Sequence, residues 1–312
     1  MAQKNLEKWL KIEITAPAEL VDALTNFLEE EGAQGVFSES LLPPGGNFPE
    51  PGDMEVVQAF FAAGARDEKR VASVRKYLER LEEIFPDSGT PSLTAEVISD
   101  PDWGEQWKKY FKPIRVSKNI VIKPTWERFT PQGHDIVIDI DPGMAFGTGQ
   151  HPSTRMCLEA MEDILLKNRS VQKARVLDVG TGTGILGIAS AKLGAEAVVC
   201  VDIDRNAADI ARENVRINGV EDRVRIVNRD VTTLHDPFSL IIANLTARLL
   251  VSLRSHLASL LTPGGYLVLS GIIDQNRPEI EARFFAPPFT PRRTITEKEW
   301  VCCVLQNEGQ AP

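Results

Sequence analysis

The 312-residue sequence has little of several features that would place a protein in a special class. No apolar run approaches the roughly 18 residues that a membrane-spanning helix needs, so we expect no membrane span. The first residues lack the apolar core and the cleavage site of a secretory signal, and we therefore expect a cytoplasmic protein. Four cysteines are present without metal-ligand spacing, so the sequence predicts no metal site: Cys157, Cys200, Cys302 and Cys303.

Lysine and arginine are scarce in the first third of the chain. Residues 1–100 contain nine Lys and Arg residues and nineteen Asp and Glu residues. The remaining residues contain 26 Lys and Arg residues and 25 Asp and Glu residues. A segment this acidic is repelled by bare nucleic acid and attracted to a basic protein. The same charge also serves solubility, and composition leaves both interpretations open.

The chain is organised around a buried strand that leads into a glycine turn, residues 175–187. Gly180, Gly182 and Gly184 allow the backbone to turn tightly and to approach a ligand closely. A helix that follows such a turn directs its first amide groups at that ligand. The sequence therefore predicts a nucleotide-like cofactor at this turn.

The glycine spacing does not decide between two cofactors. The series Gly182, Gly184 and Gly187 fits a dinucleotide fingerprint, whereas Gly180, Gly182 and Gly184 fit an S-adenosylmethionine loop. Asp178 favours the second, because a carboxylate just ahead of the turn suits an ammonium group and repels a pyrophosphate. We predict Asp178 and Gly182 as cofactor-binding residues on this basis.

The first 99 residues have the pattern of a small α+β domain. Strands are expected at 9–15, 35–39, 55–61 and 93–98 from their alternating or continuous apolar residues. Helices are expected at 19–31 and 68–85 from apolar residues at helical spacing. The order βαββαβ predicts two helices on one antiparallel sheet, the ferredoxin-like arrangement.

Residues 100–127 are predicted to link this domain to the rest of the chain. Trp103, Trp107 and Phe111 recur every four residues, which indicates a short helix with an aromatic face. Packing between two domains explains this face better than stacking on nucleic acid, because few basic residues flank it.

From residue 128 to residue 312 the pattern predicts one α/β domain. Strands and helices alternate with short turns from Arg175 onward, which is typical of a doubly wound parallel sheet. Two further strands, 290–296 and 300–305, are joined by a short charged turn and indicate an antiparallel hairpin. Dinucleotide domains normally continue with parallel strands, so the hairpin favours a methyltransferase core.

Candidate ligand-binding residues stand at the carboxyl ends of the predicted strands. Asp202 can accept hydrogen bonds from two ribose hydroxyls, and Asp230 suits either the adenine region or a helix cap. Asn244 is the candidate catalytic residue, because its side-chain carbonyl can accept a hydrogen bond from an amine and orient the nitrogen lone pair. Its alternative role is that of a polar residue between a strand and a helix.

A second loop, residues 141–154, is rich in glycine and small hydroxyl residues and is predicted to cover the ligand. Thr154 is expected to open a helix over 155–166, where its hydroxyl either caps free amides or contacts the cofactor. His151 is either a catalytic base or a hydrogen-bonding support for the loop.

Together these motifs resemble the bacterial methyltransferases that modify protein L11 of the large ribosomal subunit. The loop 141–149 is the most specific of them, because ordinary methyltransferases lack it. The matching residues are Asp102-Trp103 with Trp107, residues 141–149 with His151-Pro152, Gly184-Ile185-Leu186, Asp202-Ile203-Asp204, Asn218-Gly219-Val220, Ala243-Asn244, Leu269-Ser270-Gly271-Ile272 and Glu299-Trp300.

The resemblance implies an N-terminal domain that recognises the ribosomal protein and a class I domain that methylates lysine side chains and an N-terminal amine. It implies that the S-adenosylmethionine contacts are Thr154, Gly180, Asp202 and Asn244, with Phe146 and Thr148 added. One departure concerns the acceptor: Thr246 places a hydroxyl where the family usually has an aliphatic residue. The alternatives are a class I N-methyltransferase for another protein or small-molecule amine, a nicotinamide dehydrogenase, and a non-catalytic cofactor-binding protein.

Overall fold

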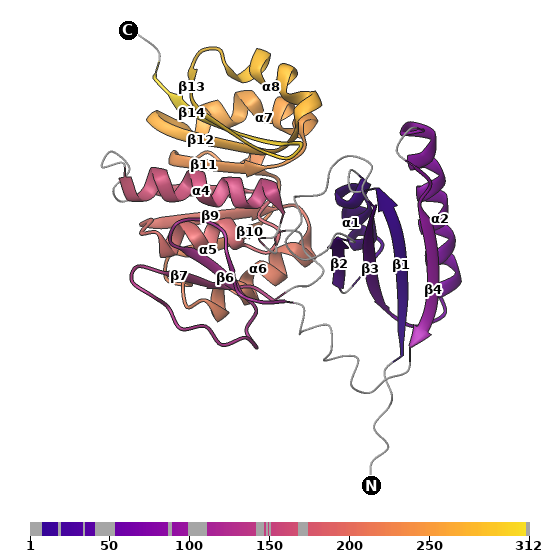
Figure 1. Cartoon of the computed structure of the whole chain (residues 1–312). Helices are drawn as coiled ribbons and strands as arrows, with labels where there is room; N and C mark the ends of the chain where they lie inside the picture. Colours follow the sequence, from indigo (N-terminus) through magenta and orange to yellow (C-terminus); the bar gives the residue numbers. More distant parts are fainter. Residues whose placement is uncertain are drawn as a thin grey trace. The chain divides into compact units, whose positions relative to one another are not determined.

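The computed structural model describes most of the chain as two compact units. The described residues are 8–17, 20–33, 35–40, 54–86, 89–98, 111–141, 147, 149, 151–167 and 174–309. Described residues up to 98, together with Phe111, fall in the first unit, and those from 112 onward fall in the second. Figure 1 shows the first unit in indigo to purple and the second in colours that run to yellow.

The first unit has the element order βαββαβ (Figure 1). Its strands form one sheet in the order β2-β3-β1-β4, and all neighbouring strands are antiparallel. This agrees with the predicted order of elements and with the antiparallel sheet. The elements are β1 (Trp9–Pro17), α1 (Val21–Glu30), β2 (Gly35–Ser40), β3 (Met54–Ala62), α2 (Asp67–Ile84) and β4 (Ser92–Ile98).

One face of this sheet carries the core of the first unit. Alternate residues of β1, from Leu10 to Ala16, are buried, while those between them are half-exposed. Both helices contribute to the same cluster, α1 with Leu24 and Leu28 and α2 with Val74, Leu78 and Leu81. The rings of Phe27 and Tyr77 stack with centroids 3.9 Å apart, so the two helices lie side by side.

The second unit begins with a small sheet of three strands: β5 (Ile114–Arg115), β6 (Ile120–Lys123) and β7 (Ile136–Asp139). β6 pairs antiparallel to β5 and parallel to β7. Ile120, Ile122 and Ile138 are buried in the core that also holds α5 (Ile185–Lys192).

The large sheet of the second unit has the strand order β10-β9-β8-β11-β12-β14-β13. The strands from β10 to β12 are parallel, and β14 is inserted antiparallel between β12 and β13. The predicted parallel sheet and terminal hairpin are therefore both present. The strands are β8 (Arg175–Val179), β9 (Ala197–Asp202), β10 (Val224–Asn228), β11 (Phe238–Asn244), β12 (Leu261–Ile273), β13 (Phe289–Glu297) and β14 (Trp300–Asn307).

Helices cover both faces of this sheet, as Figure 1 shows. Val176, Cys200 and Ile242 face a core with α4 (Pro152–Lys167), α5 and α6 (Arg205–Ile217). Neighbouring strand residues point to the opposite face, where a second core includes α7 (Ala247–Leu260) and α8 (Arg277–Phe284). Strands buried on both faces explain the continuous apolar runs in the sequence.

Some expectations fall on residues outside this description. The aromatic helix depends on residues 99–110, of which none is described, although Phe111 is buried. The division into segments 1–99, 100–127 and 128–312 stays a prediction for the same reason. Among the described residues, no helix is long and apolar enough to cross a membrane.

Candidate active site

The glycine turn lies between β8 and α5, as the sequence predicts. Gly180, Gly182 and Gly184 have φ values of 68°, 55° and 83°, in the left-handed region that favours glycine. Gly184 stands at the N-cap of α5 and supplies no side-chain cap. The amide of Gly187 donates to Asp178 Oδ2, so the amides of the first two residues of α5, Ile185 and Leu186, are the ones directed at a ligand at the turn.

Asp178 lies beneath the turn rather than on its surface. Its side chain has no exposed area, and its Oδ2 accepts hydrogen bonds from Thr181 Oγ1 at 2.6 Å and Gly187 N at 3.1 Å. Burial raises the pKa of Asp178 to about 6, against the lowering effect of those two hydrogen bonds. The carboxylate therefore joins the two ends of the turn, and the predicted direct contact with the cofactor stays a prediction.

Gly187 is where the turn packs most tightly on the sheet. A Cβ at this position would lie 2.1 Å from Sγ of Cys200 on β9 and 3.5 Å from Oδ2 of Asp178. Any larger residue would push α5 away from the sheet. This close packing is the structural reason for the third glycine of the dinucleotide-like spacing.

Asp202 ends β9 beside the turn. Its Oδ2 accepts from Gly182 N at 3.0 Å, and its Oδ1 accepts from Asp204 N at 2.9 Å. Asn228, its register partner on β10, donates to the backbone oxygens of Asp202 and Ile203 at 2.9 and 3.1 Å. The strand end is thereby fixed next to the glycine turn.

Ile203 is a candidate that our sequence reasoning did not select. Its side chain is 77% exposed, although it follows a buried strand directly. An exposed aliphatic side chain beside a carboxylate suits a ligand with an aromatic ring next to a ribose. Its position between Asp202 and Asp204 is the sequence feature that could have identified it.

The loop of residues 141–154 touches the glycine turn through Gly147. Thr183 Oγ1 donates to Gly147 O at 2.6 Å, and Asn214 Nδ2 donates to Thr183 O at 2.8 Å. This contact agrees with the expectation that the loop lies over the turn. Phe146 and Thr148, the two candidates within the loop, lie outside the described residues.

Thr154 and Asn244 come together although 90 residues separate them in the sequence. Asn244 Nδ2, at the end of β11, donates to Thr154 Oγ1 at 3.4 Å, and Thr154 is 1% exposed. The expectation that Thr154 opens the helix was wrong: α4 begins at Pro152. The Thr154 hydroxyl, lying within the first turn of α4, is therefore directed at the neighbouring strand end.

Comparisons with known proteins identify the family. The family model described as Ribosomal protein L11 methyltransferase (PrmA) matches residues 8–308. A relative from Pelobacter propionicus with that name is 38% identical over 306 residues, covering 97% of this chain and 99% of its own length. The chain belongs to this family.

Other members of the family span different bacteria. A "Ribosomal protein L11 methyltransferase" from Exiguobacterium sibiricum is 32% identical over 97% of this chain and 100% of its own length. The crystal structure of a ribosomal protein L11 methylase from Lactobacillus delbrueckii subsp. bulgaricus is 30% identical. It aligns with a TM-score of 0.57 over 64% of this chain and 100% of that chain. These findings confirm a methyltransferase of the class I fold that uses S-adenosylmethionine.

Within the L11 methyltransferase fold of this chain, His151 supports the start of α4. Its Nδ1 accepts from Ser153 N at 3.2 Å and lies 2.7 Å from Ser153 Oγ. Its ring meets the ring of Trp300 edge-on, with centroids 4.6 Å apart. These contacts favour the supporting role over that of a base.

Two further polar residues stand at the N-terminal ends of helices. Asp230 caps the 3-10 helix η4 (Val231–Thr233) by accepting from Thr232 N at 2.8 Å, which holds the pKa of Asp230 below its usual range. Thr246, the departure from the family pattern, is the exposed N-cap of α7, and its side chain makes no cap hydrogen bond. Its hydroxyl is thus available on the surface beside Asn244.

Proposed function

We propose that this chain transfers methyl groups from S-adenosylmethionine to lysine side chains and to the N-terminal amine of ribosomal protein L11. The names of its relatives support this substrate, and the strand-end residues support the chemistry. The alternative is N-methylation of another protein or of a small-molecule amine, since Thr246 alters the surface beside the acceptor site.

The contact between Asn244 and Thr154 carries this proposal. Because Asn244 Nδ2 donates to Thr154 Oγ1, the side-chain oxygen Oδ1 is left to accept. An acceptor there suits an amine, which can donate one hydrogen and direct its lone pair elsewhere. Gly271 is packed close by, and a Cβ on it would lie 3.0 Å from Asn244 Oδ1, so the amide is confined.

The residues around the glycine turn fit the cofactor. In this proposal Asp202, at the end of β9, accepts from the ribose hydroxyls, and the exposed Ile203 contacts the adenine face. The left-handed glycines Gly180 and Gly182 would allow the ligand to approach the backbone closely. Thr154 and Asn244 complete the proposed set, together with Phe146 and Thr148 of the covering loop. When bound, S-adenosylmethionine supplies an electrophilic methyl group on a sulfonium.

The chain's own contribution to the reaction is orientation in a site that excludes water. The acceptor amine must be neutral, because a protonated amine has no lone pair to attack with. Transfer of the amine out of water lowers its pKa, so a strong base is not required. Asn244 would then hold the neutral amine in line with the methyl group.

We propose different roles for the acidic first part of the chain and for the nearly neutral remainder. Residues 1–99 form the acidic unit that recognises the basic ribosomal protein, residues 100–127 link the units, and residues 128–312 bind the cofactor and catalyse. Such a protein needs neither nucleic acid nor a membrane as a partner, and it would act in the cytoplasm.

Replacement of Asn244 by alanine tests its catalytic role. We expect kcat to fall by about a hundredfold, because the amine loses its orientation, while the Kd of S-adenosylmethionine changes by a few-fold. Steady-state kinetics and calorimetry measure the two quantities. Asn276→Ala, at an exposed asparagine ahead of α8, is the control. Equal losses of turnover and cofactor affinity would show that Asn244 serves structure alone.

Mass spectrometry identifies the substrate. Ribosomal proteins are incubated with the purified chain and S-adenosylmethionine, and we expect added methyl groups on lysine side chains and the N-terminal amine of L11. Methylation of another protein, with L11 unchanged, would favour the alternative.

A further inference from the structure

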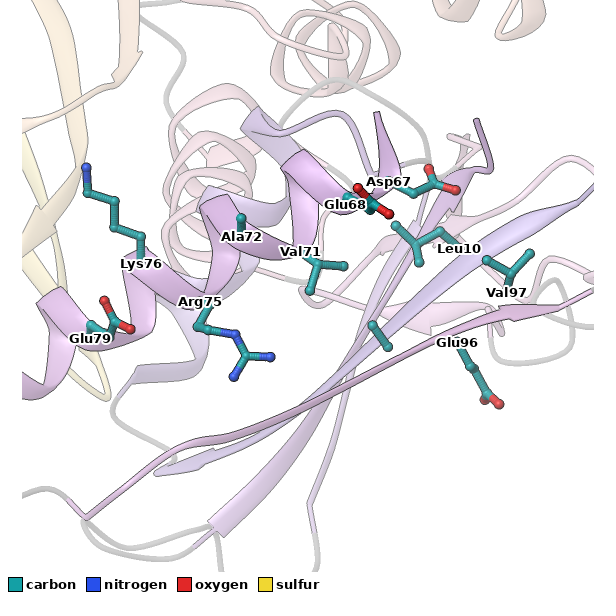
Figure 2. Close-up of a pocket in the computed structure, with 11 residues that line it drawn as sticks. Leu10, Asp67, Glu68, Val71, Ala72, Arg75, Lys76, Glu79, Glu96 and Val97 are labelled. Atoms are coloured by element: carbon teal, nitrogen blue, oxygen red, sulfur yellow. The ribbon is translucent and has the colours of Figure 1, made fainter. Parts of the chain in front are cut away.

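A groove of about 650 Å³ runs between α2 and β4 in the first unit. It exists because the buried residues of α2, Val74 to Leu81, pack in the core, while β4 at the edge of the sheet is left partly uncovered. Val97, on the helix side of β4, is 54% exposed. In Figure 2, Val71, Leu10 and Val97 lie in the space between the helix and the strand.

β4 is an open edge of the sheet. Its seven residues pair with β1 without a bulge, from Trp9↔Ile98 to Thr15↔Ser92, and among the described residues no strand pairs with its other side. Natural proteins usually protect such an edge with lysine, proline or a bulge. β4 has none of these and carries a single charge, Glu96. A regular open edge of this kind is a template for an added strand.

The charges around the groove are unequal. Three acidic side chains and two basic ones of α2 line it: Asp67, Glu68, Glu79, Arg75 and Lys76. Glu68 is exposed, whereas Glu96 lies on the opposite face of the sheet, 3.7 Å from its cross-strand partner Lys11. In Figure 2, Asp67 and Glu68 lie where α2 begins, near Val97. The end of the groove near Val97 therefore favours a positive charge.

We propose that this groove docks an extended segment of the ribosomal protein substrate, and this inference rests on the proposed function. The segment adds to the edge of β4 through backbone hydrogen bonds, and one apolar side chain enters the groove above Ala95 and Val97. A lysine or arginine of the segment meets Glu68. The apolar residues in the groove, the open edge of β4 and the acidic end of the groove together suit an extended segment of a basic protein.

Two variants separate the parts of this interaction. Ala95→Trp fills the groove, because Ala95 is exposed and faces the helix side of the sheet. Glu68→Lys reverses the charge at the acidic end. For each we expect the KM for L11 and the Kd of L11 binding to rise tenfold or more. Both are measured on the full chain, and kcat and the cofactor Kd are expected to stay within twofold.

Glu83→Lys is the matched control, because Glu83 is an exposed acid on the same helix outside the groove. We expect it to leave the KM within twofold. If the wild-type chain methylates L11 and both groove variants keep its KM and Kd, the groove proposal is overturned and the proposed function stands.

A different result would count against the proposed function itself. If the wild-type chain neither binds nor methylates L11, that function fails whatever the variants do. Analytical ultracentrifugation, which measures the oligomeric state, decides the remaining case. A dimeric wild type that becomes monomeric with Ala95→Trp would make the groove an interface between copies, and the substrate proposal would be overturned.

Discussion

At the residue scale, Asp178 is the clearest case of a side chain whose surroundings matter more than its position in the motif. A carboxylate beside glycines suggests contact with a ligand. Successive side chains of β8 point to opposite faces of the sheet, however, and the side chain of Asp178 points into the core. There it holds Thr181 and Gly187 in place, and its Oδ1 is buried without a hydrogen-bond partner among the described residues. The sequence shows which residue is acidic and does not show which way the strand faces.

The buried carboxylate makes stability depend on pH. Because its pKa is raised from 3.8 to about 6, the folded protein binds more protons than the unfolded chain between these values. The free energy of unfolding therefore falls as pH rises through this window and levels off above it, by up to about 3 kcal/mol at roughly 1.4 kcal/mol per unit.

Asp178→Asn isolates this effect, since the amide oxygen can still accept from Thr181 and Gly187. We expect the stability of the asparagine variant relative to the wild type to increase from pH 4 to pH 7. Urea unfolding at several pH values measures both proteins. All other titrating groups are shared, so a difference that stays constant with pH would contradict a raised pKa at Asp178.

At the scale of elements, the position of α4 decides where Thr154 lies. Ion pairs and one hydrogen bond connect this helix to the far half of the sheet. Arg293 on β13 pairs with Asp163 at 2.9 Å and with Glu159. Arg155 pairs with Glu297, and Ser270 Oγ on β12 donates to Ser153 O at 3.1 Å. The Arg293 pairs are exposed and the Arg155 pair is half-buried, and ion pairs this close to solvent add little. The Ser270 hydrogen bond, in contrast, is fully buried.

Ser270→Ala tests whether the buried hydrogen bond positions α4. We expect the free energy of unfolding to fall by about 1 kcal/mol and the cofactor Kd to rise by a few-fold, because the first turn of α4 carries Thr154. Unfolding curves and calorimetry measure the two effects. Ser252→Ala is the control, since this serine bonds within its own helix on the surface. Lost stability with an unchanged Kd would show that α4 is positioned by other contacts.

Most elements were predictable because their apolar residues follow the period of a helix or of a buried strand. The strands of the large sheet and the hairpin of β13 and β14 were predicted in this way. The start of α4 was not, because capping preferences favoured Thr154, whereas Pro152 suits the first turn of a helix equally well. The placing of β14 between β12 and β13 depends on contacts far apart in sequence. The meeting of Thr154 with Asn244 depends on such contacts as well.

At the scale of the whole molecule, the two parts of the chain differ in charge. The excess of acidic residues is confined to residues 1–100, and the remainder is nearly neutral. The sequence predicted this asymmetry directly, because composition needs no knowledge of folding. It could not predict the groove between α2 and β4, which depends on how far the helix covers the sheet.

Salt distinguishes recognition of the substrate from recognition of the cofactor. If the acidic unit attracts a basic protein, then raising the salt concentration from about 50 to 300 mM shortens the screening length and weakens that attraction. We expect the KM for L11 to rise several-fold over this range while the cofactor Kd changes by less than twofold. Cofactor binding is expected to depend little on the charge of residues 1–100, because its proposed contacts are backbone amides and side chains around the glycine turn. A KM that does not respond to salt would mean that docking depends on apolar contacts and backbone pairing at β4 rather than on the acidity of the first unit.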